Sequence, residues 1–368
     1  MLRTARRLFV SLLFLLCAAS LPAQDAKPPL RVAIAGLVHG HASGFFSHAL
    51  RRKDIQIVGI AEPDRVLFDR YAAQFHLDPS LYHADLDELL RTTRPQAVLG
   101  YTNTLDHRKI VETCARYQTA VMVEKPLATT YEDAQAIARA AHQAKITVLV
   151  NYETSWYPSN RAAYDILHRG EIGELRKVVV HDGHEGPKEI GVQPEFLDWL
   201  TDPKRNGGGA LFDFGCYGAD LMTWLMDGQR PLTVTAVTQT IKPDIYAHVD
   251  DEATIVLTYP KAQAILQASW NWPYSRKDME VYGRTGSVLT IASKEICVRL
   301  PKHPEATTGA APPIAAPNDD SLSYLRAVLL DGAKIDGMSS LETNVIVTEI
   351  LDAARRSAAS GKTVQLEQ

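Results

Sequence analysis

Between residues 28 and 150, short apolar runs alternate with segments of helical periodicity, and this alternation constrains the fold more than any other feature. The runs at 30–37, 55–62, 96–102, 120–125 and 146–152 read as buried strands. Strands that alternate with helices indicate βαβ units, whose right-handed crossovers build a parallel sheet. Residues 28–150 are therefore predicted to form a Rossmann dinucleotide-binding domain.

The pattern changes after residue 150. Successive strands joined by short turns predict a large open, mainly antiparallel sheet, so the expected fold class is α/β, with an α+β domain at 151–368. Helices are expected at 158–170, 212–228 and 340–361, and the proline-containing stretch 301–320 is expected to be a loop. The strands are expected at 175–184, 232–242, 253–260, 262–272, 278–286, 287–293 and 295–301.

The first 23 residues have the pattern of a secretory signal peptide. Three arginines, Arg3, Arg6 and Arg7, precede an apolar run from Leu8 to about Ala19, and small residues follow. Arg6 and Arg7 also fit a twin-arginine export signal, although the apolar run suits the general secretory route. The apolar run is short for a membrane span, so an uncleaved anchor is the less favoured alternative. An exported, periplasmic protein is predicted, with no membrane association after cleavage.

Charge and cysteine usage exclude several classes of protein. The formal net charge is −4, which gives no sign of a nucleic-acid-binding surface. Four cysteines, at 17, 114, 216 and 297, lack the spacing of a metal site, and neither a metal nor a disulfide framework is expected.

The segment VMVEKPLATT (121–130) ends a buried strand in an acid, a base and a proline. Proline cannot donate a ladder hydrogen bond, so the strand must end before Pro126. Thr129 and Glu132 read as a capping box that starts the next helix. Glu124 and Lys125 therefore lie at the carboxyl edge of the sheet, where open α/β sheets bind ligands.

A second turn, VAIAGLVHGHASGFF, follows the first strand and opens the first helix, the position of a phosphate-binding turn. Of the three glycines in the usual pattern only Gly36 is present, because Val38 and His41 occupy the others. His39 and Gly40 complete the turn. A plain strand-to-helix connection is the alternative interpretation.

Glu62 ends the second strand and is expected to bind the adenosine ribose. Its charge would repel a 2′-phosphate, which favours NAD over NADP, although Arg65 could pair with that phosphate. A solvated turn acid is the alternative.

Five motifs together resemble the Gfo/Idh/MocA family of nicotinamide-dependent oxidoreductases, from about residue 30 to the end. They occur in the family's order and are VMVEKPLATT, NYETSWYPSN, RGEIGELRKV, GGGALFDFGCYGADLMTWL and VDDEATIVLTY. The Asp213/Tyr217 pair has tyrosine where histidine is common, which resembles glucose–fructose oxidoreductase and the xylose and dihydrodiol dehydrogenases. Ser155 stands where the family has arginine, and the usual proline after the fourth strand is absent.

The resemblance implies roles for individual residues. Lys125, Asp213 and Tyr217 would be catalytic, with Tyr217 a general base if Lys125 lowers its pKa and Asp213 holding a substrate hydroxyl. It also implies a cis Lys125–Pro126 bond. The substrate would contact Tyr152 and His184 as well as the catalytic residues. The cofactor would contact Gly36, Val38, His39, Gly40, His41, Glu62, Arg65, Thr102, Asn103, His107, Glu124 and Lys125.

These observations predict a secreted oxidoreductase that moves hydride between a sugar or polyol and tightly held NAD or NADP. Retention would need an arm over the cofactor, and residues 24–30 are the only candidate in the sequence. A homodimer or homotetramer is expected through the apolar C-terminal sheet. The alternatives are an NAD-using glycosidase that transiently oxidises a ring hydroxyl, and a non-catalytic sugar-binding relative.

Overall fold

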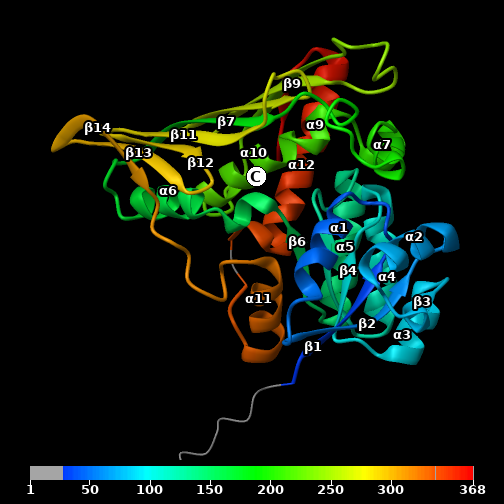
Figure 1. Cartoon of the computed structure of the whole chain (residues 1–368). Helices are drawn as coiled ribbons and strands as arrows, with labels where there is room; N and C mark the ends of the chain where they lie inside the picture. The colour runs from blue at the N-terminus through cyan, green and yellow to red at the C-terminus, as the bar shows by residue number, and fades with distance from the viewer. Residues whose placement is uncertain (1–27, 336, 368) are drawn as a thin grey trace, which may run out of the picture.

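The computed structural model describes residues 28–335 and 337–367, so the predicted signal peptide lies outside the described residues. The first domain is a six-stranded parallel sheet in the order β3-β2-β1-β4-β5-β6, which confirms the predicted Rossmann fold (Figure 1). The strand order reverses between β1 and β4, and this switch point is where dinucleotides bind in such sheets. The elements are β1 (Leu30–Ala35), α1 (His41–Ala49), β2 (Ile55–Ala61), α2 (Arg65–Phe75), β3 (Tyr82–His83), α3 (Leu86–Thr93), β4 (Ala97–Gly100), α4 (His107–Arg116), β5 (Ala120–Glu124), α5 (Tyr131–Ala144) and β6 (Val148–Asn151).

The second domain is built on a nine-stranded sheet in the order β14-β13-β12-β11-β7-β10-β9-β8-β15. All neighbouring pairs are antiparallel except β7 and β10, so the sheet is mixed but mainly antiparallel, as predicted. Its strands are β7 (Leu175–Gly183), β8 (Thr233–Gln239), β9 (Glu252–Thr258), β10 (Gln263–Ser269), β11 (Arg276–Gly283), β12 (Ser287–Ala292), β13 (Glu295–Leu300), β14 (His303–Ala310) and β15 (Val364–Gln365).

Helices cover one face of this sheet and leave the other open (Figure 1). Helix α12 contacts β8 on the sheet and α5 of the Rossmann domain, so it joins the two domains. Alternate residues of β9 and β10 are buried beneath the helices, which is the period of two that a half-covered sheet requires. The helices are α6 (Pro158–His168), α7 (Pro194–Leu200), α8 (Pro203–Asn206), α9 (Ala210–Asp213), α10 (Gly215–Leu225), α11 (Ser321–Arg326) and α12 (Leu341–Ser360).

The structure corrects four local predictions. The stretch 301–320 contains β14, because His303–Ala310 pairs with β13, and helix α11 follows it. Helix α5 is capped by Thr130, whose hydroxyl accepts from the Asp133 amide, rather than by Thr129. The predicted helix at 212–228 breaks at Phe214 into α9 and α10. Helices α7 and α8 lie where no helix was predicted.

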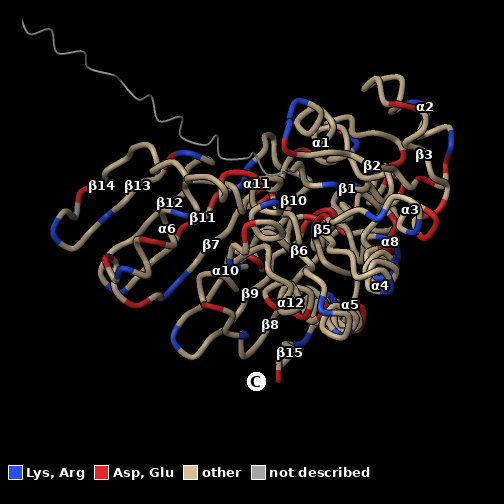
Figure 2. Tube along the Cα trace, turned by 90° about the horizontal axis from the view of Figure 1, so that it is seen from below, with Lys and Arg blue, Asp and Glu red and all other residues tan. Residues whose placement is uncertain are grey.

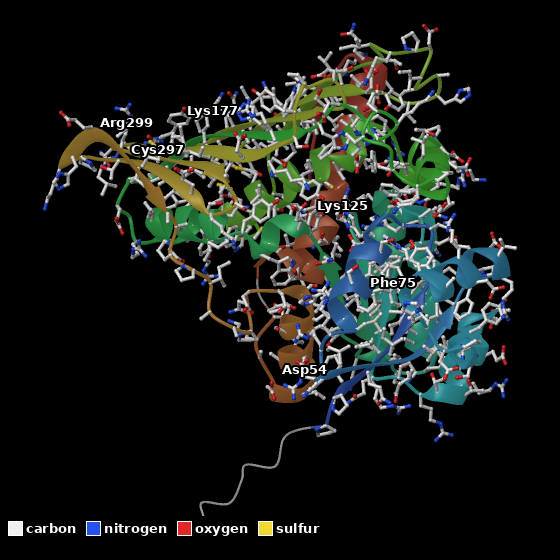
Figure 3. All side chains as sticks on the ribbon, in the orientation of Figure 1. Asp54, Phe75, Lys125, Lys177, Cys297 and Arg299 are labelled. Carbon is white, nitrogen blue, oxygen red and sulfur yellow. The ribbon has the colours of Figure 1, made fainter. Side chains whose placement is uncertain are left out.

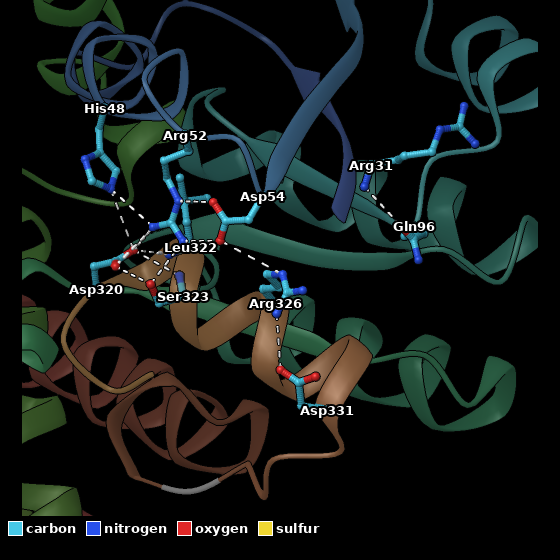
Figure 4. Close-up of polar contacts among 10 residues, drawn as sticks. All are labelled: Arg31, His48, Arg52, Asp54, Gln96, Asp320, Leu322, Ser323, Arg326 and Asp331. Carbon is cyan, nitrogen blue, oxygen red and sulfur yellow. Dashed lines mark hydrogen bonds and ion pairs between the residues drawn. The ribbon is translucent and has the colours of Figure 1, made fainter. Parts of the chain in front are cut away.

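Helix α11 packs against the Rossmann domain, and Arg52 makes several of the polar contacts between them (Figure 4). Arg52, after α1, donates to Asp54 Oδ2 at 2.7 Å, Asp320 Oδ1 at 2.9 Å and Ser323 Oγ at 3.1 Å. Asp320 is also the N-cap of α11, so the cap and the ion pair fix the helix start together. Leu322 and Leu325 of α11 then join the apolar core around β1 and α1.

Charge is mixed over the surface, with acidic and basic positions interspersed along both domains (Figure 2). Within residues 28–335 and 337–367, no helix combines the length and apolarity that a membrane crossing requires.

Candidate active site

Lys125 lies between the two domains, at the end of β5 (Figure 3). Its ammonium donates to Asp213 Oδ1 at 2.6 Å and to the Asp213 backbone carbonyl at 3.0 Å. Both side chains are buried. The Lys125–Pro126 bond is cis, as predicted. The sequence motifs around residues 125 and 213 therefore meet as one buried ion pair.

Both members of this pair carry their charge. Burial lowers the pKa of Lys125, but the Asp213 carboxylate outweighs it and the net pKa is raised. Burial raises the pKa of Asp213, but Lys125 outweighs it and the net pKa is lowered. The second carboxylate oxygen accepts from Trp270 Nε1 at 3.0 Å. Each Asp213 oxygen thus accepts one hydrogen bond from the protein, and a carboxylate oxygen can accept a second, so the expected contact with a substrate hydroxyl stays a prediction.

The glycine run before Asp213 fixes its position. Asp250 accepts from the Gly209 amide at 2.9 Å and from the Leu211 amide at 2.7 Å, and so holds the start of α9. A Cβ on Gly209 would lie 1.7 Å from the Asp250 carbonyl oxygen, so only glycine fits there.

Tyr217 lies between two ammonium groups. Lys125 Nζ is 5.0 Å from its ring centroid and Lys277 Nζ is 4.7 Å from it. Burial raises the pKa of the phenol well above its usual value, so Tyr217 stays protonated. The prediction that Lys125 lowers this pKa is wrong, because desolvation is the dominant effect. Tyr152, predicted to bind substrate, is fully buried and packs edge-on against Tyr217 at 5.5 Å, so it supports that ring from behind.

A further polar network adjoins Tyr217, and the sequence analysis missed it. Lys277 is ion-paired with Glu153, and the Tyr157 hydroxyl donates to the other oxygen of Glu153 at 2.5 Å. Lys277 comes from β11, far along the chain from Glu153, and no local motif marks it.

These groups line a cavity of about 1050 Å³. Six predicted site residues share it, namely Gly40, His41, Lys125, His184, Asp213 and Tyr217. Its cations are paired with carboxylates: Lys125 with Asp213, Lys277 with Glu153 and Arg276 with Asp278. Burial lowers the pKa of His184, whose Nδ1 accepts from the Gly186 amide. The cavity is thus polar without a surplus cation.

The phosphate turn lies beside this cavity. Gly36 has φ of +77°, and a Cβ there would lie 2.5 Å from Thr102 Cγ2, so the turn after β1 packs directly on the end of β4. Glu62 is buried and accepts from the Leu37 amide at 2.7 Å and the Asp64 amide at 2.9 Å. Burial raises its pKa, although those two amides oppose the change.

Helix α7 covers the phosphate turn. Trp199 Nε1 donates to the Val38 carbonyl at 3.2 Å, and the Phe196 ring lies 4.9 Å from that of His39. Glu195 is ion-paired with Arg70 of α2, so the cover is attached on both sides of the turn. Most of the predicted arm at 24–30 lies outside the described residues, and Leu30 begins β1. Among the described residues, helix α7 of the second domain provides a cover.

The remaining predicted residues are spread around the turn. Arg65 pairs with Asp69 and lies 4.5 Å above the Tyr82 ring, and Asn103 caps the next turn by accepting from the Asp106 amide. Glu124 accepts from His41 and from Asn151. None of Arg65, Asn103 and Glu62 borders the cavity.

His107 is buried beneath the EKP turn, which is Glu124–Lys125–Pro126, and its expected contact with the cofactor stays a prediction. Its Nδ1 lies 3.1 Å from the Pro126 carbonyl and 3.2 Å from the Leu127 carbonyl, so it donates to both. Burial, only partly opposed by these carbonyls, lowers its pKa to about 4. His107 therefore positions Lys125 as a neutral imidazole.

Comparison with known families agrees with this geometry. Residues 30–152 match the model described as an oxidoreductase family with an NAD-binding Rossmann fold, and residues 160–289 match the GFO/IDH/MocA C-terminal domain.

Several curated proteins are similar in sequence. A trans-1,2-dihydrobenzene-1,2-diol dehydrogenase of Xenopus tropicalis is 26% identical over 314 residues, which span 82% of this chain and 89% of that protein. The Macaca fascicularis protein of the same name is 25% identical over 57% of this chain and 59% of its own length. A D-xylose 1-dehydrogenase [NADP(+)] of Haloarcula marismortui is 27% identical over 52% of each chain. The chain thus matches little more than half the length of the last two.

Solved structures share the fold. An aldose-aldose oxidoreductase from Caulobacter crescentus, complexed with glycerol, superposes with a TM-score of 0.78 at 21% identity, covering 92% of this chain and all of that one. An inositol dehydrogenase homolog from Azotobacter vinelandii, complexed with NAD+, also gives 0.78, at 20% identity over 93% and 98% of the chains.

The depressed pKa of His107 predicts a loss of stability in acid. Below the unfolded-state value of 6.5 the unfolded chain binds the proton first, so the free energy of unfolding falls as pH drops from 6.5 toward 4. Full protonation corresponds to about 3 kcal/mol. His107→Asn keeps a donor toward the carbonyls but cannot titrate. Urea unfolding at pH 7 and pH 4.5 should show a smaller pH effect in this variant than in the wild type.

The matched control is His76→Asn, since His76 is an exposed helix C-cap in the left-handed region that asparagine tolerates. It should keep the wild-type pH dependence. If His107→Asn kept it too, the acid sensitivity would arise elsewhere.

Proposed function

The chain belongs to the Gfo/Idh/MocA oxidoreductase family, and on that premise we propose that it oxidises or reduces a carbinol carbon of a sugar or polyol with NAD. The observation that carries the proposal is the buried Lys125–Asp213 pair on a polar cavity at the carboxyl edge of the Rossmann sheet. An ammonium held there can bind a substrate hydroxyl beside the nucleotide site.

The turn at Gly36 and the carboxylate of Glu62 would hold NAD, which would supply the hydride acceptor, and the chain supplies the groups around the alcohol oxygen. Lys125 stabilises the negative charge that develops on that oxygen as the hydride leaves. Asp213 orients the ammonium of Lys125 and keeps it protonated, and Trp270 holds Asp213 in place through a hydrogen bond. Tyr217, protonated, offers a hydroxyl on the same cavity, and the proton given up by the alcohol would leave the site to bulk solvent.

The charge balance of the cavity supports a neutral substrate. Lys125, Lys277 and Arg276 each have a carboxylate partner, so no free cation awaits a carboxylate or phosphate. Neutral vicinal hydroxyls match the mixed donors and acceptors of the lining. The xylose and dihydrodiol dehydrogenase names of the relatives fit this substrate class.

Glu62 supports NAD over NADP. Its buried carboxylate, at the end of β2, would lie near an added 2′-phosphate and repel it. Arg65 is turned to Asp69 and Tyr82, so it is not free to offset that repulsion without losing these contacts.

We also propose export through the N-terminal signal and retention of the cofactor between turnovers. Outside the cytoplasm free nicotinamide nucleotide is scarce, so one substrate would reduce the bound cofactor and a second would reoxidise it. The cover formed by Trp199 and Phe196 over the phosphate turn supports retention.

Replacing Lys125 by alanine should lower kcat/KM for a sugar by about a hundredfold to a thousandfold, because an oxyanion-stabilising group is lost. Nucleotide fluorescence should show that NAD still binds. The control is Lys109→Ala, on the exposed side of α4, which should keep full activity. Equal rates for Lys125→Ala and wild type would exclude this role for Lys125. Release of sugar from a glycoside without net NADH would instead indicate the glycosidase alternative.

Retention predicts that protein purified from the periplasm oxidises a sugar after dialysis with no nucleotide added, provided that a second sugar serves as acceptor. A dissociation constant below micromolar, or more than about 8 kcal/mol of binding free energy, is needed. Trp199→Ala should lose nucleotide on dialysis, measured by the absorbance released on denaturation. Trp272→Ala, on the sheet domain, should retain it. Complete dependence of the wild type on added NAD would refute retention.

Self-association is proposed through the open face of the large sheet. Val179, Ile265 and Val256 form one apolar row across β7, β10 and β9, and Figure 3 places Lys177 on the same outer side. Light scattering at micromolar concentration should give two or four times the chain mass. Ile265→Lys should give monomers, whereas Val66→Lys, on exposed α2, should not. A monomeric wild type would contradict the proposal.

A further inference from the structure

Two histidines lie in the phosphate turn, and one of them, His41, stands where a dinucleotide-binding turn usually carries glycine. His39 is buried in the turn and His41 is the first residue of α1. Their ring centroids lie 4.6 Å apart, and the angle between the ring planes is 62°. The sequence GLVHGH therefore brings two imidazoles to the carboxyl edge of β1.

A carboxylate from the neighbouring motif meets them. Glu124, at the end of β5, lies 2.9 Å from His41 Nδ1. One ring nitrogen of each histidine and one Glu124 oxygen all lie within 4.8 Å of one another. In the part of the chain that the structure describes, no other group of three histidine, cysteine or acidic residues converges in this way.

The surroundings hold these three side chains in place. Asn151 donates to the other Glu124 oxygen at 2.9 Å, and Trp156 Nε1 donates to the Asn151 oxygen at 3.1 Å. The His39 ring lies against Phe196 and Trp199. Outer partners of this kind orient ligands in metal sites.

One buried polar atom is left without a partner. His39 Nδ1 accepts from the His41 amide at 3.1 Å, whereas His39 Nε2 is buried and has no hydrogen bond. Leaving such a group unpaired in the protein interior carries a desolvation cost. A cation bound to His39 would compensate that cost, with the amide contact of the turn giving way as the ring changes tautomer.

We propose that His39, His41 and Glu124 bind one first-row divalent transition metal ion. Two imidazoles and one carboxylate are a ligand set that Zn²⁺ and its neighbours accept, and three protein ligands leave positions open. His41 is 44% exposed and borders the large cavity, so the open positions face it. The Asp213 carboxylate compensates the charge of the nearby Lys125 ammonium. The Lys125–Asp213 pair therefore adds no net positive charge beside the proposed metal site.

The open positions would take oxygen ligands. The pyrophosphate of NAD and the neighbouring hydroxyls of a sugar are both oxygen donors that could reach this edge of the cavity. The metal site itself does not depend on either, because its three proposed ligands all come from the protein. It can therefore be tested apart from the proposed oxidoreductase activity.

The test is calorimetric titration of Zn²⁺ into the full chain after treatment with chelator and dialysis. One ion per chain should bind with a dissociation constant at or below micromolar. His41→Ala and Glu124→Gln should each weaken binding at least tenfold. The matched control is His48→Ala, also on α1 and exposed, which should bind as the wild type does. Circular dichroism and the thermal midpoint check that each variant is folded, and His39→Asn provides a second probe if His41→Ala is not.

Titrations of Zn²⁺ repeated in the presence of NAD or of D-xylose identify which molecule supplies the oxygen ligands at the open coordination positions. Tighter Zn²⁺ binding with NAD assigns them to the pyrophosphate, and tighter binding with D-xylose assigns them to sugar hydroxyls. Substitution with Co²⁺ should give visible absorption bands of a site with nitrogen ligands, lost in His41→Ala. Absence of Zn²⁺ binding by the wild type, equal affinity in all variants, or displacement of the ion by NAD would overturn the proposal.

Discussion

The buried ion pair between Lys125 and Asp213 joins the two domains, and the geometry of the site depends on it. Neither charge could be buried alone, since an unpaired buried ion costs several kcal/mol. The pair therefore requires that the EKP turn and the end of α9 meet in the folded protein. Trp270, which directly follows β10, donates a hydrogen bond to the second carboxylate oxygen of Asp213. The nine-stranded sheet therefore helps to position Asp213 and, through it, the ammonium of Lys125.

Around that pair the second domain closes over the first. Helix α7 lies on the phosphate turn through Trp199 and Phe196, and Arg70 holds it from the other side. The nucleotide edge of the Rossmann sheet is thus bordered by both domains rather than open to water. Water exclusion of this kind strengthens the electrostatic interactions within a site. The same contacts fix the imidazole of His39 close to Glu124.

The phosphate turn combines features that are usually separate. Gly36 keeps the positive φ and the close approach that a nucleotide turn requires, whereas His39 and His41 add two imidazole side chains, the second at a position where glycine is usual. Glu124 is shared, since it belongs to the EKP motif of the Lys125 site and also contacts His41. A metal and a nucleotide would consequently act on the same edge of the cavity, which links the two proposals chemically while leaving each testable alone.

The sequence by itself determined the elements and their order. Periodicity and turn residues are local, so the Rossmann sheet, the mainly antiparallel second sheet, Gly36 and the placement of Lys125 at a strand end followed from short stretches. It did not determine α7, β14 or the break at Phe214, because those depend on partners distant in the chain. The pKa of Tyr217, the bonding of Asp213 to Trp270, the Lys277–Glu153 pair and the convergence of His39 and His41 on Glu124 were likewise decided only by tertiary structure. Burial and three-dimensional neighbours set the charge and reach of a side chain, and neither can be read from its local sequence.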